Sequence, residues 1–390
     1  MIQKLFSKSE ALSQMHSFVE SKADRYQEMR NYDFGKLENN FVSGLSPAIS
    51  RRIITEEVFL KTILSSFSFN IVEKLIQEIC WRTYWKGYLE NRSQIWTNYL
   101  TDLVDLRYLK ASQEYENASK GETEIVCFNR WLNELVENGY LHNHTRMWFS
   151  SIWIHTLKLP WQLGAELFMK FLLDADPASN TLSWRWVAGN HTLGKTYLAN
   201  PSNIKKYTGG RLFPENQLAL KAVESNQDDT IEISNIKIEK KRNPKFVDCL
   251  LVHENDLSFE NIPKSKILLI QEKSLLAYDR SKFVRQFIDD ALIDCKNRIT
   301  KQFDKEIQLL NFDRIYALRD LVTEREIKII HTPYPAVGVL RDKILQIEKL
   351  VPVKIKFLFS KWDQAFWPYA DRGFFKLKKR IPEIVNSFLT

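Results

Sequence analysis

Cysteine is scarce in this chain. Its 390 residues include four cysteines, Cys80, Cys127, Cys249 and Cys295, which stand far apart and form no CxxC pair. The usual ligand spacings of zinc and iron–sulfur sites are therefore missing, and we expect no metal site. Widely spread thiols fit a reducing compartment, so we expect a cytoplasmic protein. We identify neither a GxGxxG motif nor a Walker lysine motif, so we expect no nucleotide-binding fingerprint.

Long hydrophobic runs are also absent. The N-terminal segment MIQKLFSKSEALSQMHSF lacks the sustained apolar core of a signal peptide. The apolar stretch from Met147 to Leu157 contains His155 and is followed by Lys158 and Pro160, so it stops short of membrane-spanning length. We therefore expect no membrane association.

The composition suits a multi-domain protein with sizeable cores, since 44% of the residues are hydrophobic. The net charge of +8 and the isoelectric point near 9.0 suit a polyanionic partner. Many ordinary enzymes are mildly basic, and binding a phosphate backbone requires the charge to gather on one face. We expect the chain to act as a monomer.

The first half of the chain has helical periodicity. Apolar residues recur at three- and four-residue spacing around Val58–Leu75, Phe128–Val136 and Trp148–Leu157. A polar stretch with alternating charge, residues 225–245, follows. These patterns predict a helical domain over residues 1–224 and a linker or exposed hairpin over residues 225–245.

Short runs rich in β-branched residues and leucine dominate residues 246–390. They alternate with helical patterns, of which Arg280–Phe303 is the longest, and this alternation predicts a smaller α/β domain with a parallel sheet. The expected strands are Phe246–His253, Lys266–Gln271, Ile307–Leu310, Glu326–His331 and Val353–Phe359.

The stretch from Gly139 to Gly189 is the most informative part of the sequence. Asn143, Arg146 and Met147 stand at i, i+3 and i+4, so a helix presents them on one face. Asp174 and Asp176 follow, then further polar and aromatic positions, Asn180, Trp184 and Trp186. In order and spacing this pattern resembles the flavin-binding helical domain of the DNA photolyase and cryptochrome family. The resemblance implies a buried FAD.

The second domain distantly resembles the α/β antenna domain of the same family. The best match is ILLIQEKSLLAYDRSKFVRQFIDDAL, read as a strand, a loop and an Arg/Phe-rich helix. Most photolyases place this domain before the flavin domain, whereas here it comes second. The resemblance leaves room for an antenna chromophore of unknown identity. An unrelated α/β domain stays an alternative.

The segment VSGLSP, residues 42–47, contains two serines ahead of an apolar helix. Either serine could cap that helix, whose free N–H groups could hold an anion. The family resemblance instead assigns Ser43, Leu45 and Ser46 to the flavin pyrophosphate. Val42 replaces a family threonine there, so one hydroxyl contact is lost.

The resemblance also implies other FAD contacts. Tyr26 resembles a tyrosine that touches the cofactor, and Arg82 resembles the arginine that pairs with its phosphates. Arg146 and Asp174 resemble an ion pair across the isoalloxazine ring. Asp176 resembles the carboxylate that accepts a hydrogen bond from that ring. Asn180 falls opposite flavin N5, where asparagine favours a fully reduced flavin.

The resemblance implies a pocket for damaged DNA bases next to the flavin. Trp81 and Trp186 match two tryptophans that sandwich a cyclobutane pyrimidine dimer, and stacking suits aromatic faces. Glu78 matches a carboxyl that hydrogen-bonds the dimer. Asn143 and Met147 match the remaining lining residues.

Tryptophans are also expected to carry electrons to the flavin. Trp184 and Trp161 fall at the proximal and middle positions of the family's photoreduction chain. The distal position falls near Tyr108, with Trp148 or Trp153 as alternatives.

The leading hypothesis is a light-driven deoxyribodipyrimidine photolyase, which uses reduced FAD to split pyrimidine dimers in DNA. The alternative is a cryptochrome-like blue-light photoreceptor that binds FAD without repairing DNA. A (6-4) photoproduct enzyme is a third possibility, although His142 and His144 do not clearly reproduce its pair of pocket histidines. A metal site at these two histidines is rejected, because residues two apart on a helix point to different sides.

Overall fold

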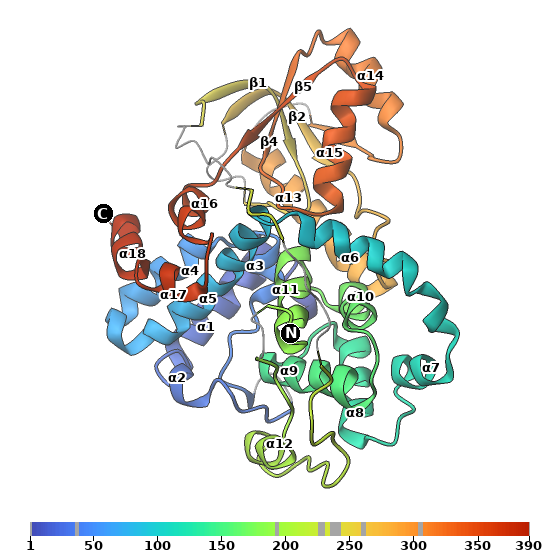
Figure 1. Ribbon diagram of the computed structural model, residues 1–390. Helices are drawn as coiled ribbons and strands as arrows, with labels where there is room; N and C mark the ends of the chain where they lie inside the picture. The colour runs from blue at the N-terminus through green and yellow to red at the C-terminus, as the bar shows by residue number, and fades with distance from the viewer. Residues whose placement is uncertain are drawn as a thin grey trace.

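The computed structural model describes residues 2–35, 39–191, 195–224, 231–234, 243–258, 263–302 and 307–389. A helical part forms one half of the molecule and a five-stranded sheet with its helices forms the other (Figure 1). The predicted linker, 225–245, lies mostly outside the described residues. None of the described helices is long and apolar enough to cross a membrane.

The helical part is built from short and medium helices. Their bounds are α1 (Lys8–Ser21), α2 (Tyr26–Met29), α3 (Ser46–Ser50), α4 (Glu56–Ser66), α5 (Phe69–Glu90), α6 (Gln94–Asp105), α7 (Gln113–Lys120), α8 (Val126–Asn138), α9 (Asn143–Ser151), α10 (Trp161–Phe171), α11 (Pro177–Val187) and α12 (Pro201–Tyr207). A π-helical turn, Ile152–Thr156, extends α9. The helix expected around Val58–Leu75 is two helices, because the chain becomes extended at Phe67 and Ser68.

The sheet is parallel throughout, with strand order β3-β2-β1-β4-β5. Its elements are β1 (Phe246–Val252), β2 (Lys264–Gln271), α13 (Lys282–Gln302), β3 (Ile307–Leu310), α14 (Ile315–Glu324), β4 (Ile329–Pro333), α15 (Val339–Leu350) and β5 (Lys354–Leu358). The central strand β1 is buried along most of its length, as expected for a sheet covered on both faces. The prediction of a parallel α/β sheet after a helical domain is confirmed.

One predicted strand begins too early. The strand expected from Glu326 begins at Ile329, because Glu326 ends the preceding turn in a left-handed conformation with φ 51°. A side chain in that region cannot continue an extended strand.

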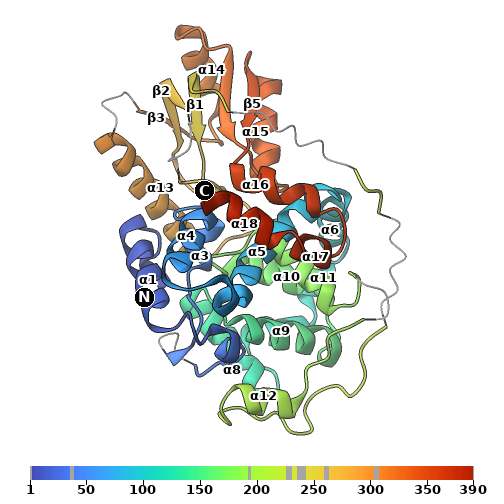
Figure 2. The same ribbon diagram turned by 90° about the vertical axis from the view of Figure 1, so that its left-hand side faces the viewer.

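The last thirty or so residues follow the sheet in sequence but pack on the helical part. This C-terminal segment consists of α16 (Lys361–Phe366), α17 (Phe374–Lys378) and α18 (Ile381–Leu389). α16 and α17 contact α5, and α18 contacts α4. Figures 1 and 2 show the three helices beside α4 and α5. Phe366, Leu377 and Val385 are buried in the same core as residues of α4 and α5. The sequence-based boundary had grouped this segment with the sheet.

Glycines fix two close approaches near the Gly139–Gly189 stretch. Gly139 ends α8 in the left-handed region with φ 64°, and a Cβ there would lie 2.7 Å from Leu173 Cγ. On α10, a Cβ at Gly164 would lie 2.3 Å from Trp184 Cη2. The absence of side chains at these positions lets α9, α10 and α11 pack closely.

A buried arginine joins the helical part, the sheet and the C-terminal segment. Arg52 follows α3, and one of its terminal nitrogens, Nη2, lies 2.7 Å from both carboxylate oxygens of Asp363. Its Nη1 lies 3.3 Å from Asp256, and its Nε lies 3.4 Å from Glu56. Burial alone would lower the pKa of Arg52, but the three carboxylates outweigh burial and raise it. Arg52 therefore stays charged.

Two further buried carboxylates lie where the sheet meets the helical part. Glu254 is 2.8 Å from Arg280 and 3.7 Å from Arg51 of the helical part. Glu90, at the end of α5, accepts hydrogen bonds from the Tyr334 hydroxyl at 2.8 Å and from Arg341 at 2.7 Å. The interface between the two parts is thus charged and hydrogen-bonded.

Replacing Arg52 with methionine should strongly destabilise the protein. The variant leaves Asp363 and Asp256 buried without their partner, which typically costs about 3–5 kcal/mol of unfolding free energy. Urea denaturation followed by circular dichroism measures the effect, and Arg319→Met on the exposed face of α14 is the control. Equal midpoints for Arg52→Met and the wild type would contradict the linking role of Arg52.

Candidate functional site

The residues that the sequence analysis singled out around Arg146 lie together. Arg146 is on α9, and it donates two hydrogen bonds of 3.0 Å to the two oxygens of Asp174. A third, of 2.9 Å, goes from Arg146 Nε to the Leu141 carbonyl. This geometry is a bidentate ion pair with both partners held in place.

Arg82 of α5 adds a second cation to the same carboxylates. It donates to the Asp174 carbonyl oxygen at 3.2 Å, and its Nη2 lies 3.6 Å from the Asp174 carboxylate. Arg82 also forms an ion pair with Asp176. Asp176 in turn caps α11 by accepting a hydrogen bond of 2.9 Å from the Ser179 N–H. The guanidinium of Arg82 therefore bridges two carboxylates that precede α11.

Asp174 is buried but remains ionised. Burial alone would raise the pKa of its carboxyl, but Arg146 and Arg82, with hydrogen bonds from Arg146 and Ser46, outweigh burial and lower it. Ser46 begins α3, so segments from α3, α5, α9 and the α10–α11 connection converge on this carboxylate. We call Ser46, Arg82, Arg146, Asp174 and Asp176 the Arg–Asp cluster.

The serines of the VSGLSP segment do not act as helix caps. Neither serine caps α3, whose preceding residue is Leu45. The Ser43 hydroxyl instead accepts a hydrogen bond of 3.3 Å from the Leu45 N–H, because Gly44 turns the chain with φ 66°. The Ser46 hydroxyl donates a hydrogen bond to the Asp174 carboxylate. The serine cap, which was the alternative to pyrophosphate binding, therefore does not form.

Tyr26 begins α2, which packs against α5. Its ring meets Phe18 edge-on at 6.3 Å. Burial and the nearby Glu78 carboxylate raise the pKa of the Tyr26 hydroxyl. Tyr26 is therefore close to Glu78.

Asn180 and Trp184 lie on α11 beyond the Arg–Asp cluster. The Asn180 amide is buried and donates a hydrogen bond of 2.7 Å to the Ala165 carbonyl of α10. Trp184 is 1% exposed, and its indole N–H is buried with no hydrogen-bond partner among the described residues. The Ser179 hydroxyl on the same helix is likewise buried without a partner among the residues described.

These features suit a bound dinucleotide cofactor. Two arginines can pair with phosphates, and the buried Ser179 hydroxyl and Trp184 N–H have no hydrogen-bond partner among the described residues. The residues present are therefore compatible with FAD.

The two tryptophans expected to stack a lesion lie in different surroundings. Trp81 is covered by Phe374 of α17, with ring centroids 3.6 Å apart and planes at 11°. Trp186 stacks on Tyr197 at 5.6 Å. Within the described ranges, no ring contact joins Trp81 to Trp186. The contact of Phe374 with Trp81 was not anticipated from the sequence, because no pattern around Phe374 predicts packing against α5.

Glu78, Asn143 and Met147 are accessible to different degrees. Glu78 is partly exposed, 3.5 Å from Lys74 and 3.9 Å from Arg30. Asn143 is exposed at the start of α9, and Met147 is half-buried one turn later.

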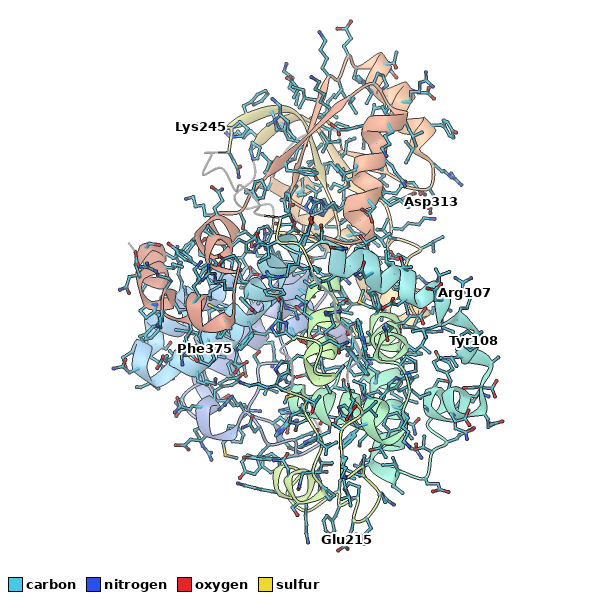
Figure 3. The ribbon with its side chains drawn as sticks, in the orientation of Figure 1. Arg107, Tyr108, Glu215, Lys245, Asp313 and Phe375 are labelled. Carbon is cyan, nitrogen blue, oxygen red and sulfur yellow. The ribbon has the colours of Figure 1, made fainter. Side chains whose placement is uncertain are left out.

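Trp161 lies in a row of aromatic rings that the sequence analysis did not identify. Trp161 stacks on Tyr99 of α6 at 5.6 Å, and Tyr99 lies 5.3 Å from Trp96. Tyr108, the expected distal position, is 73% exposed at the outer edge of the molecule (Figure 3). Trp153, one of the alternatives, meets Trp184 edge-on at 6.4 Å.

His142 and His144 occupy ordinary structural positions. His142 precedes α9 and accepts a hydrogen bond from the His144 N–H through its Nδ1 at 3.2 Å. His144 stacks on Trp148 at 4.3 Å. The part of the chain that the structure describes contains no group of three or more potential metal ligands.

One motif escaped the sequence analysis. Residues 189–196, GNHTLGKT, match the spacing GxxxxGK[ST] of a phosphate-binding P-loop. A P-loop follows a strand and opens a helix, whereas this segment follows helix α11, and Lys195 and Thr196 are exposed. Residues 192–194 lie outside the described residues. The context around the motif therefore does not support a P-loop.

Lys86 is a buried cation that sequence reasoning also missed. It lies one turn after Arg82 on α5 and borders a cavity of about 40 Å³ between the helical part and the sheet. Asp176 and Arg280 border the same cavity. Burial lowers the pKa of Lys86, and no hydrogen bond or ion pair of its ammonium group is found among the described residues. The helical spacing to Arg82 could have drawn attention to it.

A larger cavity, of about 730 Å³, lies beside α8, and Glu134, Tyr140 and His142 are among its lining residues. Burial and the nearby Asp33 raise the pKa of Glu134 to about 7. The charged form of Glu134 is therefore disfavoured in the folded protein.

Replacing Glu134 with glutamine should change how stability depends on pH. The raised pKa means that wild-type stability falls as the pH rises from the unfolded value of about 4.3 through the folded value. The thermal midpoint of Glu134→Gln, relative to wild type, should therefore increase between about pH 4.5 and pH 8. Glu137→Gln, an exposed neighbour on α8, is the control. A constant difference between Glu134→Gln and wild type across this range would refute the inference.

Comparison with known proteins finds similarity to the helical part. Residues 75–208 match the family model described as the FAD binding domain of DNA photolyase. A deoxyribodipyrimidine photo-lyase of Agrobacterium fabrum is 26% identical over 184 residues, covering 46% of this chain and 38% of the relative. A photo-lyase of Streptomyces griseus is 30% identical over 121 residues, covering 31% of this chain and 26% of the relative. A cryptochrome DASH of Solanum lycopersicum is 27% identical over 211 residues, covering 51% of this chain and 36% of the relative.

The matches cover only part of these proteins. The chain spans less than half the length of the three relatives. A crystal structure of a class III photolyase from Agrobacterium tumefaciens overlaps 52% of this chain and 43% of its own, at 23% identity and a TM-score of 0.44. The sequence match alone therefore carries the assignment. Residues 75–208 of this chain are thus similar to the FAD binding domain of DNA photolyase.

Proposed function

We propose that this protein binds FAD and repairs cyclobutane pyrimidine dimers in DNA under blue light. The Arg–Asp cluster carries the proposal, because it brings together the residues that the family resemblance assigns to FAD. Most of the cluster lies within the match to the photolyase FAD-binding domain. When bound, reduced FAD would supply the light-driven electron that opens the dimer, and the electron would then return to the flavin, with no net redox change.

The chain's own residues would position the cofactor. Arg146 and Asp174 hold each other in a fixed plane through two hydrogen bonds, so they can support a flat ring without rearranging. Arg82 can exchange its contact with Asp176 for a phosphate, since a guanidinium pairs well with either anion. The remaining FAD contacts are assigned to Tyr26, Ser43, Leu45, Ser46 and Asn180.

The substrate would lie near Glu78 and the aromatic side chains of α5 and α11. Glu78 is partly exposed and can offer a carboxyl to a base edge. Trp186 and Trp81 remain the proposed stacking residues, with Asn143 and Met147 at the rim. Bases that are flipped out of a duplex are typically held between aromatic side chains in this way.

A blue-light photoreceptor is the second candidate. The contact of Phe374 with Trp81 favours it, because one face of that indole is already covered. A relative named cryptochrome DASH is also similar to this chain. A (6-4) photoproduct enzyme gains no support, since His142 caps α9 and His144 stacks on Trp148. An antenna chromophore, a monomeric state and a cytoplasmic location remain predictions.

Purified wild-type protein should carry FAD and repair a dimer-containing oligonucleotide under blue light. Arg146→Met should lose most of the FAD, because Asp174 is then buried with only part of its positive partner. Glu78→Gln should keep FAD but lower the repair yield per absorbed photon. Absorption spectra and chromatography of the irradiated oligonucleotide measure both. FAD binding without any repair would favour the photoreceptor, and full FAD content in Arg146→Met would refute the cofactor assignment.

Photoreduction should depend on Trp184 and Trp161 rather than on Tyr108. Trp161→Phe should retain FAD but slow its reduction by blue light and a thiol, because the family resemblance places Trp161 in the middle of the photoreduction chain and its ring stacks on Tyr99. Trp184→Phe should have the same effect, and Tyr108→Phe, at an exposed position, is the control. Time-resolved absorbance measures the rate. Slow photoreduction in Tyr108→Phe together with a normal rate in Trp161→Phe would contradict the proposed electron path.

A further inference from the structure

The C-terminal segment forms part of the surface next to the proposed lesion pocket. Phe374 lies flat on Trp81 and edge-on to Tyr84 at 5.4 Å, and it is only 8% exposed. α17 therefore begins directly over the aromatic residues of α5. Figures 1 and 2 show α17 close to α5.

This segment is firmly attached to α5. The Trp362 indole N–H donates a buried hydrogen bond of 2.7 Å to the Thr83 hydroxyl. Gly87 leaves room for the segment, since a Cβ there would lie 2.7 Å from Ala370 Cβ. Arg92 donates to the Asp371 carbonyl at 2.8 Å. α17 is thus a fixed part of this surface rather than a loose cover.

The outer side of the fixed segment is basic and carries an exposed aromatic ring. Phe375 is 79% exposed, although the neighbouring Phe374 is buried (Figure 3). The sequence from 371 to 380, DRGFFKLKKR, has five basic residues and one acidic residue, a net charge of +4. We define the basic face of α17 as Arg372, Phe375, Lys376, Lys379 and Arg380, all of which are exposed.

Part of this charge is available to a partner. Lys376 pairs with Asp371 at 2.7 Å and Arg380 pairs with Glu383 at 3.0 Å, both at the surface. The Arg372 side chain is 80% exposed, and its Nε lies as far as 4.0 Å from the nearest carboxylate oxygen of Asp371. No ion pair of Lys379 occurs among the described residues. Exposed pairs are weak, so an incoming polyanion can compete with them.

We propose that the basic face of α17 contacts the DNA strand beside the lesion, with Phe375 stacking on a base. This inference rests on the proposed function for the identity of the partner. Cations gathered around an exposed aromatic ring suit single-stranded DNA, where phosphates meet the charges and a base meets the ring. An anionic membrane is a poorer match, because one phenyl ring on a five-residue helix offers little apolar area.

The test is dark binding of a fluorescent single-stranded oligonucleotide containing one thymine dimer. Phe375→Ala should weaken binding about tenfold with an unchanged salt dependence, as expected for the loss of one stacking contact. The double variant Arg372→Glu, Lys379→Glu should weaken binding and reduce the slope of log affinity against log salt by about two. Tyr316→Ala and Arg319→Glu, at exposed positions on α14, are the matched controls and should bind like wild type.

The outcomes separate this inference from the proposed function. Normal DNA binding by both α17 variants would overturn the inference while leaving light-driven repair intact. Loss of DNA binding in the variants without any repair by the wild type would support the inference and reject the repair function. Wild-type binding to vesicles of 30 mol% phosphatidylserine, weakened by the α17 variants while their DNA binding is normal, would replace DNA with a membrane.

Discussion

The buried guanidinium of Arg52 is the interaction on which the arrangement of this molecule depends. It contacts a carboxylate from each of three regions: Glu56 of the helical part, Asp256 of the sheet part and Asp363 of the C-terminal segment. Desolvating these charges is costly, so each contact is needed to compensate the others. Arg52 also adopts a left-handed backbone conformation with φ 50°, a strain that only the surrounding contacts can maintain.

This anchoring has a consequence for the surface near the proposed lesion pocket. Because Asp363 holds α16 against the helical part, the chain that follows must cross α5, and Phe374 meets Trp81 there. The C-terminal segment, which follows the sheet in the chain, thus covers one face of the Trp81 ring and places basic side chains beside it. The surface around Trp81 is therefore built from α5 and from the C-terminal segment, which lie far apart in the sequence.

The Arg–Asp cluster follows a different physical logic. Its charges are nearly balanced, with Arg82 and Arg146 facing Asp174 and Asp176. Lys86, one turn from Arg82, places a buried amine close to the same carboxylates, and burial lowers its pKa. The proposed FAD site therefore depends on Arg82 and Arg146, whose guanidinium groups pair well with either a carboxylate or a phosphate.

Much of the fold was predictable from the sequence, since helical and strand periodicities reflect local hydrogen bonding and burial. The parallel sheet and helix α13 were anticipated nearly to their ends, whereas the start of β4 depended on a left-handed turn at Glu326. The resemblance also linked Arg146 to Asp174, and the structure brings them together. The sequence could not reveal that Phe374 covers Trp81, nor that Trp362 hydrogen-bonds Thr83, 279 residues away. Such contacts join distant segments with no shared periodicity, so only the path of the folded chain determines them.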